Sequence, residues 1–136
     1  MTDILVSKDD GQVVTLTLND APANCLTMEM MSAIKMEIDR VNQSKDHKLV
    51  IFESSNEKIF CSGHSFNEVQ EMIKNNDMKS QELLFAECSE MLMKIRKSPK
   101  IFVAKVRGIA TAGGLGLVSI MDCVFSSKSA RFALGG

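Results

Sequence analysis

The sequence of 136 residues contains no tryptophan and no tyrosine, and it has only two histidines and two prolines. Ten methionines are available to fill space that large aromatic side chains would otherwise occupy. Because thioether side chains are flexible, they pack adaptably but specify the shape of a core only weakly. We therefore interpret the methionines as core residues and not as part of a cofactor site.

The chain also lacks a strong charge of either sign. Its formal net charge at pH 7 is -1, and its lysines are scattered. Since nucleic-acid binding relies on clustered basic residues, we expect no nucleic-acid partner. No apolar run has the length of a membrane span, and Met1 to Val14 is too polar and acidic for a signal or transit peptide. We expect an intracellular protein, mitochondrial or cytoplasmic, without a membrane span.

The four cysteines are widely spaced and form no C-x-x-C pair. This spacing indicates neither a zinc knuckle nor a redox pair, so we expect reduced thiols. A metal site that combines His47 and His64 with these cysteines is also disfavoured, and no metal is expected. A thiol enzyme remains an alternative, with Cys61 as the nucleophile and His64 as its base.

The length and the average composition, 45% hydrophobic and 24% charged, predict one globular domain over residues 1–136. The order of strands and helices predicts an α/β fold with at least partly parallel strands. The predicted elements are a hairpin of residues 4–7 and 12–18, a helix over 27–42, strands over 48–54 and 59–61, helices over 65–74 and 80–97, a strand near 101–106, a short helix from 113, a strand over 123–126 and an extended segment over 130–134.

Local signals sharpen several of these boundaries. Thr27, Ser65 and Ser80 are predicted helix caps, and Ser65 with Glu68 matches a capping box. The apolar segment around residues 101–106 is predicted to be a strand buried on both faces.

Two glycine-containing corners each join a strand to a helix. The first corner is Ser62 to Ser65, and the second runs from Gly108 to Gly114. Glycine permits positive φ and close approach, and the amides at the following helix start lack helical partners. Such corners suit a negatively charged oxygen, although glycines that only allow tight packing remain the plainer alternative. The second corner matches neither a phosphate-binding P-loop nor the G-x-G-x-x-G dinucleotide motif.

Four segments together resemble the enoyl-CoA hydratase/isomerase superfamily, the crotonases, and in particular the enoyl-CoA hydratase domain-containing proteins. They are PANCLTMEMM (22–31), IFCSGHSFNEV (59–69), RGIATAGGLGLVSIMD (107–122) and SSKSARFAL (126–134). The resemblance implies a crotonase-like spiral of ββα units, truncated at its C-terminal side. It also implies an acyl-CoA thioester as substrate, no separate cofactor, and a homotrimer or hexamer for full-length members.

The resemblance also implies the site residues. The backbone amides of His64 and Gly113 would form an oxyanion hole for the thioester oxygen, and we expect the His64 ring to point elsewhere. The positions that match substrate contacts are Ala23, Cys25, Ser65, Phe66 and Asn67.

The chain departs from the family pattern at its acid-base residues. The family's two glutamates correspond to Gly116 and to Gly136 or a residue beyond it. The expected function is enolate stabilisation in acyl-CoA or fatty acid metabolism, of the hydratase or isomerase type. The alternative is a noncatalytic protein or fragment that binds CoA thioesters, because proton transfer needs a positioned acid or base.

Overall fold

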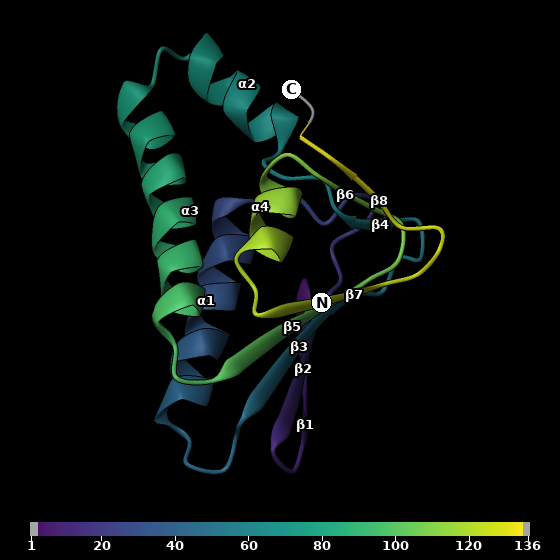
Figure 1. The fold of residues 1–136 in the computed structure, drawn as a ribbon. Coiled ribbons are helices and arrows are strands. Elements are labelled where there is room, and N and C mark those ends of the chain that lie inside the picture. Colours follow the sequence, from purple (N-terminus) through teal and green to yellow (C-terminus); the bar gives the residue numbers. More distant parts are fainter. Residues whose placement is uncertain (1–2, 135–136) are drawn as a thin grey trace.

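The computed structural model describes residues 3–134. Strand pairs followed by helices recur along the chain (Figure 1). The elements are β1 (Leu5–Asp10), β2 (Val13–Leu18), α1 (Met28–Gln43), β3 (Leu49–Ser54), β4 (Ile59–Cys61), α2 (Phe66–Lys74), α3 (Met78–Lys97), β5 (Ile101–Val106), β6 (Ile109–Thr111), α4 (Gly113–Ser119), β7 (Cys123–Ser126) and β8 (Arg131–Ala133).

The strands form two sheets. The larger sheet has the order β1-β2-β3-β5-β7, in which only the β1-β2 pair is antiparallel, and the smaller parallel sheet has the order β4-β6-β8. The pairs β3-β4, β5-β6 and β7-β8 thus each give one strand to each sheet. This confirms the predicted α/β fold with largely parallel strands. Strand β6 was missed, because its three residues lie inside the glycine corner.

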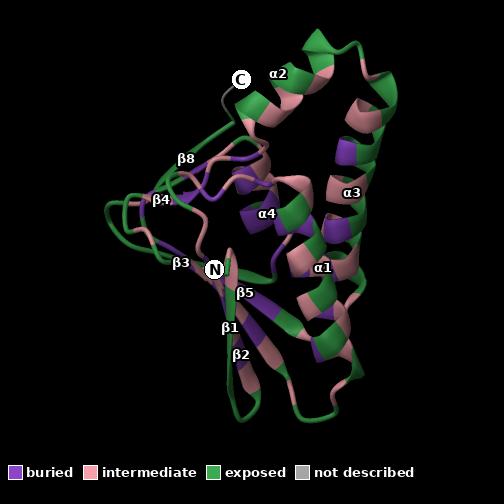
Figure 2. Ribbon diagram, turned by 180° about the vertical axis from the view of Figure 1, so that it is seen from behind, coloured by how far each residue is buried: buried purple, intermediate pink, exposed green. Residues whose placement is uncertain are grey.

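Alternating side chains build the core of the larger sheet. Val14 and Leu16 of β2 pair with Val50 and Phe52 of β3, and all four are fully buried. Figure 2 shows this alternation as buried and partly exposed bands along the strands. The prediction of two buried faces for residues 101–106 holds in the middle of the strand, where the consecutive residues Phe102, Val103 and Ala104 are buried. It fails at Lys105, which is exposed and pairs with Glu53 at 3.5 Å.

The helices cover the sheets through methionine and aliphatic side chains. Helices α1 and α3 run side by side, with α4 on the same side of the molecule and α2 across the end of α3 (Figure 1). Met30, Met31 and Met91 are buried, whereas Met36, Met78 and Met93 are exposed, so the interpretation of the methionines as core residues holds only in part. Among residues 3–134, no helix is long and apolar enough to cross a membrane.

The caps agree with the sequence in two of three cases. The Thr27 hydroxyl accepts a bond from the Met30 amide at 3.1 Å, and Ser65 caps α2. Ser80 is not a cap, because α3 begins earlier and the Asp77 carboxylate accepts the Ser80 amide at 3.0 Å.

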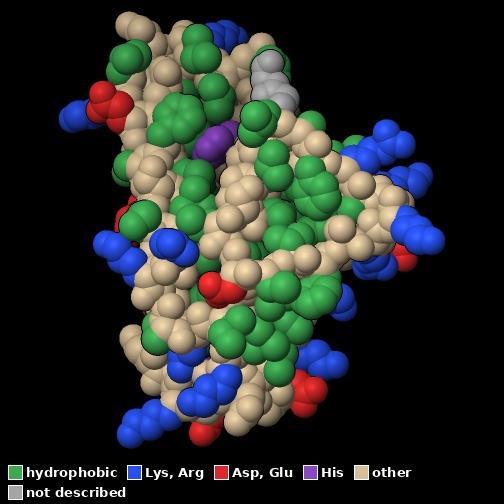
Figure 3. All heavy atoms as spheres, viewed as in Figure 1, with side chains coloured by type: hydrophobic (Ala, Val, Ile, Leu, Met, Phe, Trp, Pro, Cys, Tyr) green, Lys and Arg blue, Asp and Glu red, His purple; other side chains and the backbone are tan. Residues whose placement is uncertain are grey.

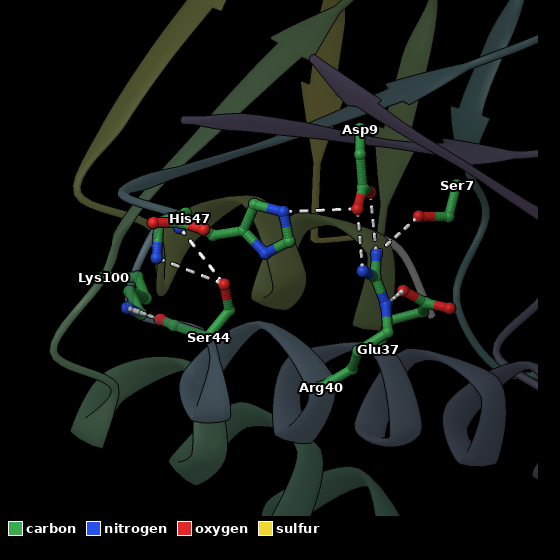
Figure 4. Close-up of polar contacts among 8 residues, drawn as sticks. Ser7, Asp9, Glu37, Arg40, Ser44, His47 and Lys100 are labelled. Carbon is green, nitrogen blue, oxygen red and sulfur yellow. Dashed lines mark hydrogen bonds and ion pairs between the residues drawn. The ribbon is translucent and has the colours of Figure 1, made fainter. Parts of the chain in front are cut away.

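A polar cluster joins the tip of the first hairpin to the end of α1 (Figure 4). Arg40 donates to both carboxylate oxygens of Asp9 at 2.9 Å and to Glu37 at 2.9 Å. His47 Nε2 also lies 3.2 Å from Asp9 Oδ2. These contacts hold α1 over the hairpin, and they involve no residue of either glycine corner.

Candidate functional site

The first corner is held by the loop that precedes α1. The Ser62 amide donates to the Ala23 carbonyl at 3.1 Å, and the Leu26 amide donates to the Gly63 carbonyl at 2.7 Å. Gly63 has φ of +88°, a conformation that side-chain-bearing residues rarely adopt. The Cys25 sulfur lies 3.5 Å from the Ser62 hydroxyl. These bonds fix the path of the chain just before His64.

Asn24 is the residue that fastens this loop, and sequence reasoning missed it. It is 2% exposed and has φ of +49°. Its side-chain nitrogen donates to the Ser54 hydroxyl at 2.8 Å and to the Phe60 carbonyl at 3.0 Å, while its oxygen accepts the Asp20 amide at 2.7 Å. An asparagine after a proline is a turn signal, but its distant partners have no sequence signal.

The second corner follows β6 and opens α4. Ala112 has φ of +50° and ψ of -122°, which is strained for a residue with a Cβ, and its amide donates to the Ala133 carbonyl at 3.1 Å. A Cβ placed on Gly114 would lie 2.1 Å from the Cys61 carbonyl oxygen. Helix α4 therefore packs directly against the end of β4, and only glycine fits at this contact.

The structure brings His64 and Gly113 together. A Cβ on Gly63 would lie 2.8 Å from the Gly113 nitrogen, and a Cβ on Gly113 would lie 3.7 Å from His64 Cδ2. Within residues 3–134, neither the His64 amide nor the Gly113 amide donates a hydrogen bond. Two backbone donors without a partner among the described residues thus lie at corners that touch each other.

The His64 ring also belongs to this junction. Its Nδ1 lies 3.3 Å from the Leu26 carbonyl oxygen, and the ring packs edge-on against Phe85 of α3 with centroids 5.4 Å apart. These contacts hold the ring against Leu26 and Phe85, with Cδ2 facing Gly113, and the expectation that the ring points elsewhere than the thioester stays a prediction. The carbonyl and the phenyl ring hold the imidazole beside the second corner.

The thiol alternative conflicts with the structure. The Cys61 side chain is fully buried, and this burial raises the pKa of its thiol to about 12. A thiol with that pKa has very little of the reactive thiolate at neutral pH. The His64 ring nitrogen pairs with Leu26 instead. Cys61 is therefore a core residue in contact with Gly114 and not a nucleophile.

A pocket of about 330 Å³ lies beside the first corner. It is formed by the loop before α1 and the first turn of α2. All five residues predicted to contact the substrate line it: Ala23, Cys25, Ser65, Phe66 and Asn67. The structure therefore gathers residues that are about 40 positions apart in the sequence into one surface hollow.

Other features lie away from this junction. A pocket of about 460 Å³ at the opposite ends of β4 and β6 is lined by charged Lys58, Arg107 and Arg131, and it contains none of the predicted site residues. The two histidines occupy different places, since His47 contacts the first hairpin and His64 contacts α3. Across the described part of the chain, no three His, Cys, Asp or Glu side chains are grouped to hold a metal ion.

A family model described as enoyl-CoA hydratase/isomerase matches residues 8–136. The chain belongs to the enoyl-CoA hydratase/isomerase family. The mouse protein named enoyl-CoA hydratase domain-containing protein 3, mitochondrial, is 31% identical over 129 residues, which are 95% of this chain and 42% of that protein. This confirms the resemblance and the α/β crotonase-like fold deduced from the sequence motifs.

Solved structures of enoyl-CoA hydratase/isomerase proteins share the fold of this chain. The enoyl-CoA hydratase of Mycobacterium smegmatis matches with a TM-score of 0.90 and 33% identity, over 98% of this chain and 51% of that one. The human enoyl-CoA hydratase domain-containing protein 3 matches with a TM-score of 0.89 and 26% identity, over 96% and 50%. The chain thus spans about half the length of the relatives it matches.

Gly116 occupies the position at which the family resemblance implies a glutamate. Gly116 is the fourth residue of α4, three residues after Gly113, and a Cβ there would meet no atom within 4 Å. The second expected position, Gly136, lies outside the described residues. Asp122, the carboxylate nearest the end of α4, accepts the Phe102 amide at 2.8 Å and so holds β5.

Proposed function

We propose that this chain binds an acyl-CoA thioester and stabilises the enolate form of its acyl group. The observation that supports the proposal is the contact between the two corners, at Gly63 and Gly113, together with the lack of a protein acceptor for the His64 and Gly113 amides among residues 3–134. Family membership supports the same substrate class. In this proposal the thioester oxygen accepts a hydrogen bond from each amide.

The chemistry follows from where negative charge develops. When a proton leaves the carbon next to the thioester, the electron pair moves onto the carbonyl oxygen. Preorganised donors stabilise that charge, and removal of one such donor elsewhere costs roughly 3 to 4 kcal/mol of transition-state stabilisation. Both donors here are backbone groups on ordered corners, so they need little reorganisation during the reaction.

The pocket beside the first corner would hold the coenzyme side of the substrate. In this proposal Ala23 and Cys25 contact the coenzyme, while Ser65, Phe66 and Asn67 line the path of the pantetheine arm. CoA is then part of the substrate, and no separate cofactor takes part. For the whole protein we propose a homotrimer or hexamer active in acyl-CoA metabolism, as the family resemblance implies.

A second candidate function is thioester binding without catalysis. It is favoured by Gly116, where the expected carboxylate is replaced by open space. Such a protein would bind acyl-CoA and polarise its carbonyl without turnover. The two candidates share the same binding site and differ only in proton transfer.

The test uses an aryl-conjugated enoyl-CoA, whose absorption moves to longer wavelength when its carbonyl is polarised. We expect the unmodified chain to bind it and to produce that shift. Gly113→Pro removes the amide hydrogen at the first position of α4, where proline is compatible with a helix. This variant should lose most of the shift, whereas the control Gly116→Ala should retain it.

The possible results separate the parts of the proposal. Circular dichroism first establishes that both variants keep the helix content of the unmodified chain. A full shift in folded Gly113→Pro would refute the two-amide assignment. No binding of any acyl-CoA by the unmodified chain would refute the function itself. Binding with a shift but without turnover of enoyl-CoA or 3-enoyl-CoA would favour the noncatalytic candidate.

A further inference from the structure

We propose that Nε2 of His64 is the group that moves the substrate proton, in addition to the role of the His64 amide. This inference rests on the proposed binding of a thioester at the two corners. The surroundings of Gly63 and Gly113 supply the first argument. Of the three atoms nearest to a Cβ placed on Gly113, His64 Cδ2 at 3.7 Å is the one that belongs to a titratable side chain.

The hydrogen bond at Nδ1 assigns the tautomer of the ring. The Leu26 carbonyl oxygen can only accept, so Nδ1 of His64 carries the hydrogen that is shared over 3.3 Å. In the neutral imidazole the other nitrogen, Nε2, then has a free lone pair. Such an anchored ring has the arrangement that a general base requires, with one nitrogen oriented and the other available.

The position of the ring brings its Nε2 side towards the second corner. Cδ2, the atom bonded to Nε2, is the His64 atom nearest to the site of a Gly113 Cβ, at 3.7 Å. Phe85 packs edge-on against the ring and is itself 53% exposed. Figure 3 shows hydrophobic side chains gathered on this face, over α3 and beside α4. The ring therefore borders the second corner and lies beside an apolar surface suited to an acyl chain.

Glu68 is the competing carboxylate. It lies in the first turn of α2, its Oε1 is buried, and no described residue pairs with that oxygen. The Ser65 hydroxyl accepts the Glu68 amide at 3.3 Å, so only this half of the predicted capping box forms. Glu68 does not line the pocket beside the first corner, and none of its atoms is among the three nearest to a Cβ placed on Gly63 or on Gly113. The geometry therefore favours His64.

A single base defines the class of reaction. The Nε2 lone pair takes a proton from Cα of a β,γ-unsaturated thioester, and the carbonyl π electrons move onto the oxygen held by the two amides. The imidazolium then returns the proton to Cγ, the double bond moves to Cα and Cβ, and the neutral ring is restored. This 1,3-proton shift needs no water and no second acid. Hydration would also require a water molecule activated by another group.

The experiment measures two reactions of the 136-residue chain: exchange of the α-hydrogen of butyryl-CoA in D₂O, and conversion of a 3-enoyl-CoA to its 2-enoyl isomer. His64→Asn replaces the base, because the asparagine amide can still donate to the Leu26 carbonyl but has no basic nitrogen. His47→Ala is the matched control, since it removes the other histidine. Glu68→Gln tests the competing carboxylate.

We expect His64→Asn to lower both rates by about 100-fold or more, while its dissociation constant for the aryl-conjugated enoyl-CoA and the absorption shift stay within about threefold, because the backbone amide remains. His47→Ala and Glu68→Gln should react like the unmodified chain. The inference is overturned if His64→Asn keeps its rates, if Glu68→Gln loses them, or if the unmodified chain binds and polarises the thioester without exchange. That last result leaves the proposed binding function intact, whereas absence of binding overturns both.

Discussion

The two corners reach the same junction by different physical means. The first corner is held by hydrogen bonds from the loop before α1, above all by the buried side chain of Asn24. The second corner is held by steric fit, because Gly114 contacts the backbone of Cys61 and Ala112 adopts a positive φ. The comparison teaches that changes of polarity should damage the first corner, and added volume should damage the second.

Damage to the two corners should therefore destabilise the fold by different mechanisms. A buried amide that loses its partners costs about 1 to 3 kcal/mol. A Cβ that overlaps a backbone oxygen cannot be relieved by a side-chain rotation, so the main chain has to move. The second corner is therefore the more brittle of the two, although it contains fewer specific bonds.

The largest effect should come from one methyl group at the second corner. Gly114→Ala places its Cβ 2.1 Å from the Cys61 carbonyl oxygen, so α4 must separate from β4. We expect a loss of about 3 kcal/mol or more in the free energy of unfolding, measured by urea denaturation.

The same substitution two positions later gives the control. A Cβ on Gly116 meets nothing within 4 Å, and alanine is the better helix former. Gly116→Ala should therefore stabilise the chain by up to about 1 kcal/mol. Equal effects of the two substitutions would show that the second corner does not depend on the close contact with Cys61.

A smaller effect should follow from removing the buried Asn24 side chain that holds the first corner. Asn24→Ala leaves the Ser54 hydroxyl and the Phe60 carbonyl without their amide donor, and alanine is strained at φ of +49°. We expect a loss of about 1 to 3 kcal/mol in urea denaturation.

Asn56→Ala is the matched control, because the Asn56 side chain also makes two hydrogen bonds but both are exposed: it donates to the Pro22 carbonyl of this loop at 3.1 Å and accepts from the Lys58 amide at 2.8 Å. It should cost about 0.5 kcal/mol or less. If Asn24→Ala is as mild as this control, the first corner is not held by its buried hydrogen bonds.

Sequence reasoning found what local patterns determine. The alternation in β2, the cap at Thr27 and the glycines of both corners follow from spacing and residue type, and the motifs gave the family. It missed Asn24 because Ser54 and Phe60 are 30 and 36 residues away. It did not identify the packing of the His64 ring on Phe85, because a helix two elements later has no local signal at residue 64.

Burial explains the remaining errors. The segment 101–106 is apolar enough to suggest a strand covered on both faces, yet Ile101 is 54% exposed in β5. Composition reports how hydrophobic a strand is, but the layers that pack around it decide which residues are covered. Likewise, Cys61 and His64 are close in sequence, but only the fold shows that one is sealed in the core and the other lies at the surface junction.

The smallest effect should come from a polar network that is exposed. The bidentate bond between Arg40 and Asp9 joins α1 to the hairpin, but the two side chains are 41% and 44% exposed. Water and salt screen such pairs, so Arg40→Ala should cost less than about 1 kcal/mol at pH 7. The cost should shrink further in 1 M NaCl, unlike that of Asn24→Ala.

The pH dependence of this pair has a defined sign. The hydrogen bond from Arg40 holds the pKa of Asp9 below its ordinary value of 3.8. The unfolded chain therefore binds a proton at Asp9 more readily, and the pair's contribution is complete above pH 3.8 and declines as pH falls through the lowered pKa. Urea denaturation at pH 6 and pH 3 should show a smaller acid-induced loss for Arg40→Ala than for the unmodified chain. An equal acid-induced loss in both proteins would mean that the bond from Arg40 does not lower the pKa of Asp9 in the folded chain.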